Sequence, residues 1–427
     1  MSSKKVAGAS SSKVSGMRRE QDAPATLTPK LRFPEFQDAA AWSLYILEEL
    51  EGLGWVELGR GDVISNQDIK AIPGNYPIYS SSVKNNGLMG SYGRFIFDEE
   101  LISWSVDGGG DFFHRPSHKF SVTNVSGYMR LDTSHLNYRF TASQLQALHA
   151  SLTFDYQFKA HPSVIRKLYR LAIPSVNEQQ KIAECLTTLD EVIAAQSQKL
   201  DALKTHKKGL MQQLFPRAGE TLPRLRFPEF QAAPEWEAKL LGQVIEIASG
   251  QVDPKQPPYC DSPQIGSENI ESHSGKLVNV KSAGDKGVIS GNYAFDENDI
   301  LYSKIRPALN KVAAPAFKGI CSADIYPIRP ANGGLLRGYL LYLLLSQEFL
   351  DYAIRNSERG KIPKINRDGL LTYTTLIPSP AEQQRIATCL TTLDDLITAQ
   401  SAKLSALKTH KKGLMQQLFP SPGEVGA

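Results

Sequence analysis

The sequence lacks the features of several protein classes. It has no apolar core segment in its first 28 residues, which are rich in Ser, Ala and Lys, so no signal peptide is recognisable. Its most apolar run, Leu335–Leu345, contains Arg337 and is too short to span a bilayer. No C-x-x-C pair occurs among its cysteines, which favours free thiols: Cys185, Cys260, Cys321 and Cys389. We therefore expect a cytoplasmic protein without a membrane partner, and a disordered tail over residues 1–28.

Motifs of catalysis are also missing. The segment Gly108–Asp111 lacks the Lys-Ser/Thr ending of a phosphate-binding loop. The segment Gln256–Tyr259 resembles the [DNS]-P-P-[YFW] signature of amino-methyltransferases, but it starts with Gln and no F-x-G-x-G strand precedes it. His114 and His118 have helical metal spacing, yet Pro116 between them breaks a helix and no third ligand is near. The sequence thus predicts no catalytic, cofactor or metal site in this chain.

The net charge and the length of the chain exclude fewer functions and architectures. The net charge is only +4 over 427 residues, which permits nucleic-acid binding through local basic patches but does not require it. A hydrophobic content of 41% is enough to bury real cores, and the length suits two or three domains.

The most informative feature is a long internal repeat. Residues 173–216 and 377–420 are identical at 35 of 44 positions, whereas the regions before them share almost nothing. A shorter repeat opens each half, as PKLRFPEF at residue 29 and PRLRFPEF at residue 223. The chain therefore reads as two tandem copies of one module: an opening segment, a variable domain and a repeated helix.

Each long repeat has the signals of a helix with defined ends. Ser175 with Glu178, and Ser379 with Glu382, fit the S-x-x-E capping box. Apolar residues alternate at spacings of four and three over more than four heptads, which indicates a coiled-coil seam with polar Lys207 and Lys411 in seam positions. The other seam residues are Ile182, Leu186, Leu189, Ile193, Gln196, Leu200, Leu203, Leu210 and Leu214, and in the second copy Ile386, Leu390, Leu393, Ile397, Gln400, Leu404, Leu407, Leu414 and Leu418.

The connection between the halves favours an antiparallel pair. The first helix leads almost directly into the second variable domain, so antiparallel helices need no long return of the chain. Parallel helices would need the linker at residues 217–236 to run back along the whole coil. The linker is long enough to do so, so parallel packing is disfavoured but stays open. Antiparallel packing would place the variable domains at opposite ends, related by a pseudo-twofold axis. Helices of roughly 35 residues would span about 50 Å.

The variable domains read as mixed α/β, so we expect an α+β protein. In the first domain, short strands are predicted at Tyr76–Tyr79, Phe95–Phe97, Leu101–Trp104 and Phe120–Val125, followed by a helix at Leu136–Leu152. In the second, they are predicted at Val244–Ile247, Ile300–Tyr302, Lys311–Ala313 and Ile325–Ile328, followed by a helix at Leu335–Ile354. Since strands precede a helix in both, the two domains are expected to share a fold. The predicted boundaries are 1–28 tail, 29–172 first variable domain, 173–216 first helix, 217–236 linker and opening segment, 237–376 second variable domain, 377–420 second helix and 421–427 tail.

These motifs together resemble the specificity subunit of type I restriction–modification systems. The resemblance rests on I-P-x-x-x-E-Q-[QR]-x-I-A at Ile173–Ala183 and Ile377–Ala387, and on the L-x-x-L-D-x-x-I continuation at Leu186–Ile193 and Leu390–Ile397. Segments starting at Gln264 (QIGSENI) and Tyr302 (YSKIRP) also fit. It covers about residues 29–420.

The resemblance implies a function and partners. Each variable domain would be a target-recognition domain that reads one half of a split site in double-stranded DNA. The helices would dock two methyltransferase subunits, and motor–nuclease subunits would join to form the restriction enzyme. The chain itself would hold no cofactor, since S-adenosylmethionine, ATP and Mg²⁺ belong to the partner subunits.

Candidate DNA contacts fall into clusters of basic, amide and hydroxyl side chains, which make phosphate contacts and read base edges. In the first domain they are Tyr79, Ser80, Ser81, Lys84, Asn85, Asn86, His114, Arg115, Lys119 and Lys159. In the second they are Glu268, Asn269, Lys304, Arg306, Asn310, Lys311, Lys361, Lys364, Asn366 and Arg367.

Two other functions compete with DNA reading by a targeting subunit. A coiled-coil adaptor would assemble protein partners without reading DNA, and removal of one variable domain need not then cause a DNA phenotype, whereas a split-site reader should lose one half-site. A self-contained modification enzyme would methylate DNA without a partner, although the missing cofactor motifs argue against it.

Overall fold

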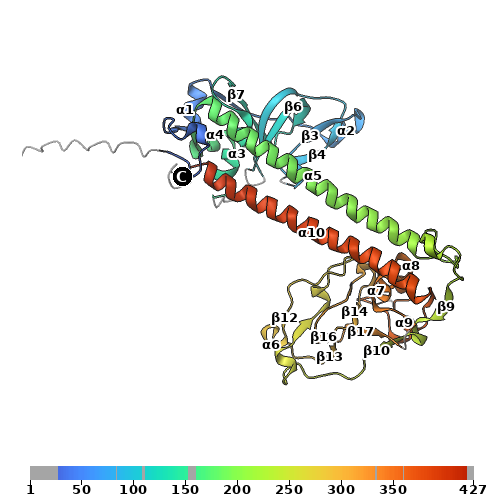
Figure 1. The fold of residues 1–427 in the computed structure, drawn as a ribbon. Coiled ribbons are helices and arrows are strands. Elements are labelled where there is room, and N and C mark those ends of the chain that lie inside the picture. Colours follow the sequence, from blue (N-terminus) through green and yellow to red (C-terminus); the bar gives the residue numbers. More distant parts are fainter. Residues whose placement is uncertain are drawn as a thin grey trace, which may run out of the picture. The chain divides into compact units, whose positions relative to one another are not determined.

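The computed structural model describes residues 27–82, 84–107, 111–151, 160–331, 334–358 and 360–420 (Figure 1). The chain forms two compact units: unit 1 comprises Met1–Ala194 with Ala406–Ala427, and unit 2 comprises Ala195–Ser405. Each unit contains one variable domain, the beginning of one long helix and the end of the other. These helices are α5 (Val176–Leu214) and α10 (Pro380–Leu418), of 39 residues each.

The two long helices run antiparallel within each unit, as predicted. In unit 1, Ile182 and Leu186 near the start of α5 share a buried cluster with Leu418, at the end of α10. In unit 2, Leu214 at the end of α5 shares a cluster with Ile386 and Leu390, near the start of α10. All predicted seam residues are buried or half-buried.

Polar residues in the seam bind polar residues of the other long helix. Gln400 donates its side-chain amide to the Gln196 carbonyl and side-chain oxygens. The Lys411 ammonium binds Asp190 in unit 1, and that of Lys207 binds Asp394 in unit 2. Such polar residues in a seam typically fix the register of a coiled coil at some loss of stability.

The helix starts differ from the predicted capping box in one respect. The hydroxyls of Ser175 and Ser379 accept hydrogen bonds from the backbone N–H groups of Glu178 and Glu382 at 3.4 Å. This is one of the two hydrogen bonds that make up a capping box. The two carboxylates do not reach back to the serine N–H groups. They are buried, with 1% exposure, and accept forked hydrogen bonds from arginines of the opening segments instead.

These arginines fold the opening segments and tie them to the helices. Arg32 donates to Glu178 at 2.7 Å and to the carbonyls of residues 39 and 40. Arg226 makes the equivalent bonds to Glu382 at 2.8 Å and to the carbonyls of residues 233 and 234. In unit 1, Leu27 is also fixed, since it is buried and bridges to Trp42, although it falls within the predicted tail.

Unit 1 is built on a six-stranded sheet in the order β2-β7-β5-β6-β3-β4, antiparallel except at β3–β6. A separate two-stranded sheet pairs β1 with β8, which leads into α5. The elements are β1 (Ser43–Ile46), α1 (Leu47–Gly52), β2 (Val56–Arg60), α2 (Asn66–Ala71), β3 (Tyr76–Tyr79), β4 (Leu88–Tyr92), β5 (Phe97–Ser105), β6 (Phe112–Val122), β7 (Ser126–Leu131), α3 (Tyr138–His149), α4 (Pro162–Leu168) and β8 (Arg170–Ile173).

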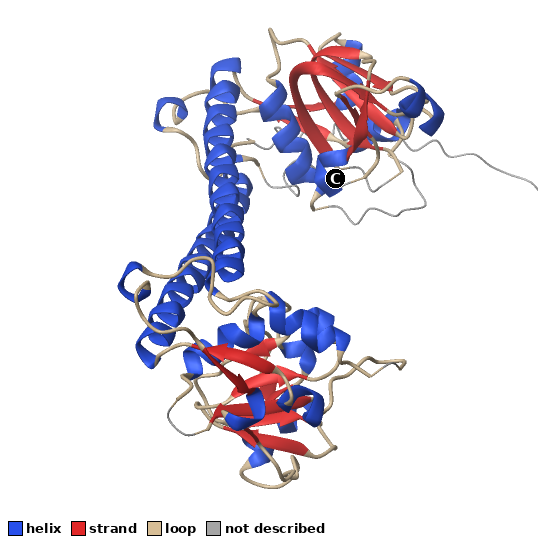
Figure 2. Ribbon diagram, turned by 90° about the vertical axis from the view of Figure 1, so that its right-hand side faces the viewer, coloured by secondary structure: helices blue, strands red, loops and turns tan. Residues whose placement is uncertain are grey.

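Unit 2 contains two four-stranded sheets, β10-β17-β14-β15 and β12-β11-β16-β13, and the pair β18–β9 (Figure 2). Its elements are β9 (Glu237–Leu240), β10 (Ile245–Ile247), β11 (Pro263–Ile265), β12 (Lys281–Ser282), α6 (Ala283–Lys286), β13 (Asn292–Phe295), β14 (Ile300–Ser303), β15 (Val312–Ala313), β16 (Gly319–Ser322), β17 (Ile325–Pro330), α7 (Arg337–Leu345), α8 (Gln347–Arg355), α9 (Arg367–Leu371) and β18 (Thr374–Ile377).

The strand predictions locate the sheets but miss some joins and breaks. The strand predicted at 101–104 lies in β5, and of the strand predicted at 95–97 only Phe97 belongs to it. A bulge between Glu99 and Leu101 interrupts the pairing of β5 without ending the strand. The single helix predicted at Leu335–Ile354 is wrong. Ser346 is extended there and caps the start of α8, so α7 and α8 are separate helices.

The two domains share one strand order, in line with the expected common fold. The first half of β5 pairs with the second half of β6, as β13 pairs with β16 in unit 2. The second half of β5 pairs with the first half of β6, as β14 pairs with β15 in unit 2. The parallel pair β3–β6 likewise corresponds to β11–β16. Two long strands of unit 1 are thus each broken into two in unit 2, which converts one sheet into two.

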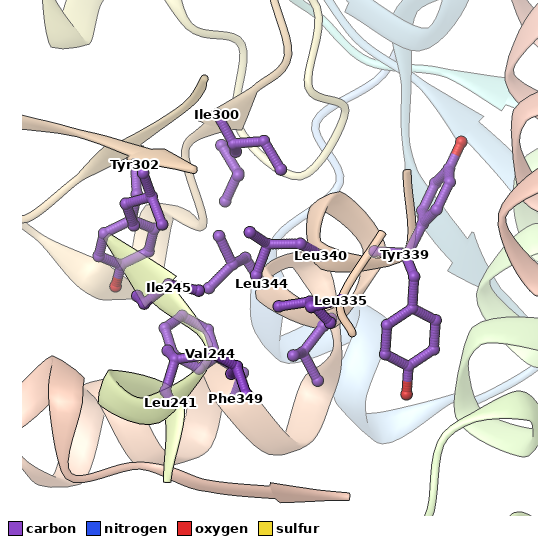
Figure 3. Close-up of a cluster of buried hydrophobic side chains, with 14 of the residues drawn as sticks. Leu241, Val244, Ile245, Ile300, Tyr302, Leu335, Tyr339, Leu340, Leu344 and Phe349 are labelled. Atoms are coloured by element: carbon purple, nitrogen blue, oxygen red, sulfur yellow. The ribbon is translucent and has the colours of Figure 1, made fainter. Parts of the chain in front are cut away.

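The core of unit 2 joins its domain to both long helices. Apolar side chains around β10, from β14 and from α7 converge, among them Val244, Ile300, Tyr302 and Leu340 (Figure 3). The same cluster includes residues from the end of α5 and the start of α10. Within the described part of the chain, no helix is both long and apolar enough to cross a membrane.

We expect the buried Arg32–Glu178 pair to be a main support of unit 1. Glu178→Ala leaves the Arg32 guanidinium, whose side chain is 7% exposed, without its counter-ion, and should lower the free energy of unfolding by about 3–5 kcal/mol in urea titrations. Glu35→Ala is the control, because it removes an exposed pair with Lys181 and should leave the urea midpoint unchanged. Equal effects of the two substitutions would contradict this assignment.

Candidate nucleic-acid interface

In unit 1, the loop between β3 and β4 brings several predicted residues together. The backbone N–H of Ser80 binds the carbonyl of Gly87 at 2.8 Å and closes the loop. Lys84, Asn85 and Asn86 are exposed at its tip. Both asparagines have left-handed backbones, with φ of 50° and 51°, a conformation that Asn tolerates better than most residues.

Arg115, which the sequence predicted as a DNA contact, does not lie at the surface. It is buried, with 4% exposure, because the β6 strand directs it inward beneath the loop. Its Nε donates to Ser103 Oγ at 2.8 Å, its Nη2 donates to the Asn86 carbonyl at 2.7 Å, and its guanidinium lies 3.6 Å from the centre of the Tyr79 ring. Burial lowers the pKa of this guanidinium to about 10. The guanidinium is therefore held inside the domain, with Nε and Nη2 bonded to the protein.

The other basic candidates of unit 1 have different fates. His114 Nε2 binds Glu100 at 2.6 Å, and burial lowers its pKa, so it is not the free phosphate ligand that we expected. Lys119 is exposed, 4.0 Å from Asp98 and stacked over Phe95. Lys159 lies outside the described residues, as do Gly108–Gly110.

In unit 2, two predicted segments far apart in the sequence lie side by side. Ile365 N–H binds the Lys304 carbonyl at 2.9 Å, and Arg306 N–H binds the Pro363 carbonyl at 2.7 Å. The loop after β14 and the loop before α9 thus form one surface, the paired loops of residues 303–311 and 361–367. Arg306, Lys361 and Lys364 are exposed on it.

Tyr326 supports the paired loops and was missed by the sequence analysis. The Lys304 ammonium lies 5.2 Å and the Arg367 guanidinium 5.9 Å from the centre of its ring. No local signal could have identified it, because it is a strand residue of β17 that meets these cations only through the fold.

Several predicted base readers of unit 2 are structural instead. Asn269 is buried and donates to the carbonyls of Val278 and Asn279 at 3.0 Å, while its oxygen accepts from Gly266 N–H and the Lys286 ammonium. Asn310 is also buried, with its amide on the carbonyl of residue 345.

The remaining candidates of unit 2 are also engaged. Lys311 donates to the Ser267 carbonyl, and Glu268 is exposed but paired with Lys286 at 3.0 Å. The side-chain oxygen of Asn366 caps α9 by accepting from Gly369 N–H at 2.7 Å, and Arg367 donates to the carbonyls of residues 247 and 248.

The same loop pairing occurs in unit 1. Ser105 N–H binds the Asp111 carbonyl and Ala160 N–H binds the Val106 carbonyl, just as Ser303 N–H binds that of Lys311 and Ile365 N–H that of Lys304. In the sequence, Lys159 precedes Ala160 as Lys364 precedes Ile365. In both domains, therefore, the segment after one strand (β5 or β14) is hydrogen-bonded to the segment before a helix (α4 or α9).

Two of the motifs weighed in the sequence have other roles among the described residues. His114 and His118 lie on strand β6, where His114 binds Glu100 and His118 contacts Tyr79. Gln256–Tyr259 is a turn, closed by Tyr259 N–H on the Gln256 carbonyl at 2.9 Å. Among the described residues, no group of three or more His, Cys, Asp or Glu could hold a metal ion.

Comparison with known proteins identifies the family. The model of the type I restriction modification DNA specificity domain matches twice, at residues 49–205 and 234–409, which together make up more than half of the chain. The chain belongs to this family of type I specificity subunits. Each match contains one variable domain and most of the long helix that follows it.

Named relatives carry the same description. The chain is 30% identical over 239 residues to the specificity subunit of the type I restriction enzyme EcoDI of Escherichia coli, covering 51% of this chain and 53% of that protein. It is 21% identical over 379 residues to the MjaVIII specificity subunit of Methanocaldococcus jannaschii, covering 82% and 86%. The match to EcoDI thus spans only about half of that relative.

Solved structures share the fold. The specificity subunit from M. genitalium aligns with a TM-score of 0.60 at 16% identity, over 92% of this chain and all of that one. A chain from a study of complex assembly and conformational transition in a type I system aligns with a TM-score of 0.53 at 16% identity, over 89% and 98%.

The buried amide of Asn269 gives a test of its structural role. Asn269→Ala should destabilise unit 2 by about 1–3 kcal/mol in urea titrations, because the Val278 and Asn279 carbonyls and the Gly266 N–H lose their hydrogen bonds to this amide. Asn356→Ala is the control, since that exposed amide makes one bond, to the Tyr352 carbonyl, and should shift stability by less than about 0.5 kcal/mol. A stable Asn269→Ala protein with altered base preference would instead restore Asn269 as a reader.

Proposed function

We propose that this chain is the non-catalytic targeting subunit of a type I restriction–modification complex and binds a bipartite DNA site, one half-site per variable domain. One observation supports this most strongly. The two units repeat the same strand order, helix contacts and loop pairing, yet the exposed side chains of their loops differ. That is the arrangement expected of two readers with different targets on one scaffold.

In unit 1, the first half-site would be contacted by the tip of the β3–β4 loop. Asn85 and Asn86 carry exposed amides, which can make bidentate contacts to adenine, and Lys84 can bind phosphate. Tyr79, Ser80 and Ser81 form the half-buried base of this loop. Lys119 supplies a further positive charge, as would Lys159 by its place in the sequence.

In unit 2, the second half-site would be contacted by the paired loops. Arg306 has a left-handed backbone with φ of 48° and an exposed guanidinium, suited to guanine or phosphate. Lys361 and Lys364 flank it on the neighbouring loop, and the half-buried Lys304 contributes charge over Tyr326.

The partners would be two methyltransferase subunits and the motor–nuclease subunits, in the cytoplasm. The support is the family, whose relatives are named as subunits of restriction enzymes, and the likeness to a chain from a type I complex. S-adenosylmethionine, ATP and Mg²⁺ would bind to those partners, and this chain would contribute no catalytic group.

The function can be tested by sequencing modified DNA. The chain would be expressed with its neighbouring methyltransferase subunit in a methylation-deficient host, and the DNA read by single-molecule sequencing. Two short half-sites around a fixed unspecified gap, with adenine modified on both strands, are expected. A stable complex that modifies no motif would favour an adaptor, and methylation by the chain without its partner would favour a self-contained enzyme.

Phosphate contacts of unit 2 predict a specific salt dependence. Lys364→Ala should reduce the slope of log K against log salt by about 0.9 for the assembled methyltransferase, as loss of one phosphate contact requires. Lys239→Ala is matched to it, because both lysines are paired with a glutamate, Glu237 or Glu358, and their side chains are 39% and 51% exposed. Equal slopes for the wild type and Lys364→Ala would remove Lys364 from the interface.

A further inference from the structure

We infer that Arg115 is a positioning residue of the first recognition domain, which holds the β3–β4 loop so that Asn85 and Asn86 read bases of the first half-site. The inference rests on the proposed function. It assigns a role to a buried residue that is not itself one of the proposed DNA contacts.

Arg115 connects the sheet to the loop. One end of its guanidinium is fixed by Ser103 of β5, through Nε and Oγ at 2.8 Å, and the other binds the Asn86 carbonyl at 2.7 Å. The flat group also lies against the Tyr79 ring, at the end of β3. The side chain therefore contacts a central strand, the start of the loop and the tip of the loop together.

The loop is anchored at other points as well. Ser105 Oγ donates to the Ser81 carbonyl at 2.6 Å, and Ser80 N–H binds the Gly87 carbonyl at 2.8 Å. Gly87 has a φ of 79°, and a Cβ added there would lie 3.2 Å from Arg115 Nη2. With its backbone fixed in this way, the loop directs both asparagine side chains to solvent.

Stability alone does not account for this arrangement. Two consecutive non-glycine residues in left-handed conformation are strained, and burial of a guanidinium is unfavourable unless its bonds offset the loss of water. Glycine would meet the backbone requirement with less strain. Asparagine adds an amide that can pair with adenine, so residue type and conformation together suit a preorganised reader.

The test compares discrimination at the two half-sites in the assembled methyltransferase. For each protein, the affinity is measured for DNA with the intact motif and for DNA with one base pair substituted in the first or in the second half-site. The ratio of the two affinities is the discrimination at that half-site. Arg115→Met should lower discrimination at the first half-site by about tenfold or more. Discrimination at the second half-site, which unit 2 would read, serves as the internal control and should not change.

A second variant covers the case in which Arg115→Met fails to fold. Replacing Asn85 and Asn86 together by glycine permits the left-handed backbone and removes the amides, so it should lose the same discrimination while the protein still folds. The inference is overturned if the double glycine variant discriminates normally, or if Arg115→Met lowers only the melting temperature. Failure of the wild type to show any split motif would instead overturn the proposed function.

Discussion

Antiparallel pairing of the two long helices is the constraint on which both units depend. Because α5 starts in unit 1 and ends in unit 2, and α10 does the reverse, neither unit is complete without a segment of both helices. Leu418 and Phe419 pack among the apolar residues of the first unit, and Leu214 and Phe215 occupy the equivalent place in the second. Each recognition domain is thereby built onto the scaffold rather than attached by a linker.

The same ionic contacts occur twice on this scaffold. The Arg32–Glu178 and Arg226–Glu382 pairs fix the opening segments, and Lys411–Asp190 and Lys207–Asp394 fix the helix register. Each domain adds its own contact to the register pair: Arg139 binds Asp190 in unit 1, and the Tyr342 hydroxyl binds Asp394 in unit 2. The repeated part therefore specifies how a domain is held, while its loops are free to differ in what they read.

The scaffold was predictable because its signals are periodic and duplicated. Seam spacing and chain connection gave the helices and their orientation, whereas the break at Ser346 depends on a local cap within an apolar run. The candidate site was only partly predictable. Composition located clusters of polar and basic residues in loops, but Arg115, Asn269 and Asn310 turn inward to partners 9 to 35 residues away in the sequence. Such pairing is decided by tertiary structure, which a single sequence does not display.

The central claim is that each domain reads its own half of one DNA site. Hydroxyl-radical footprinting of the assembled methyltransferase on its motif tests this most directly, with the wild type compared to a variant in which Arg306, Lys361 and Lys364 are replaced by alanine. We predict two protected patches for the wild type, and weakened protection of only one patch for the variant. A single continuous footprint, or equal weakening of both patches, would contradict the account.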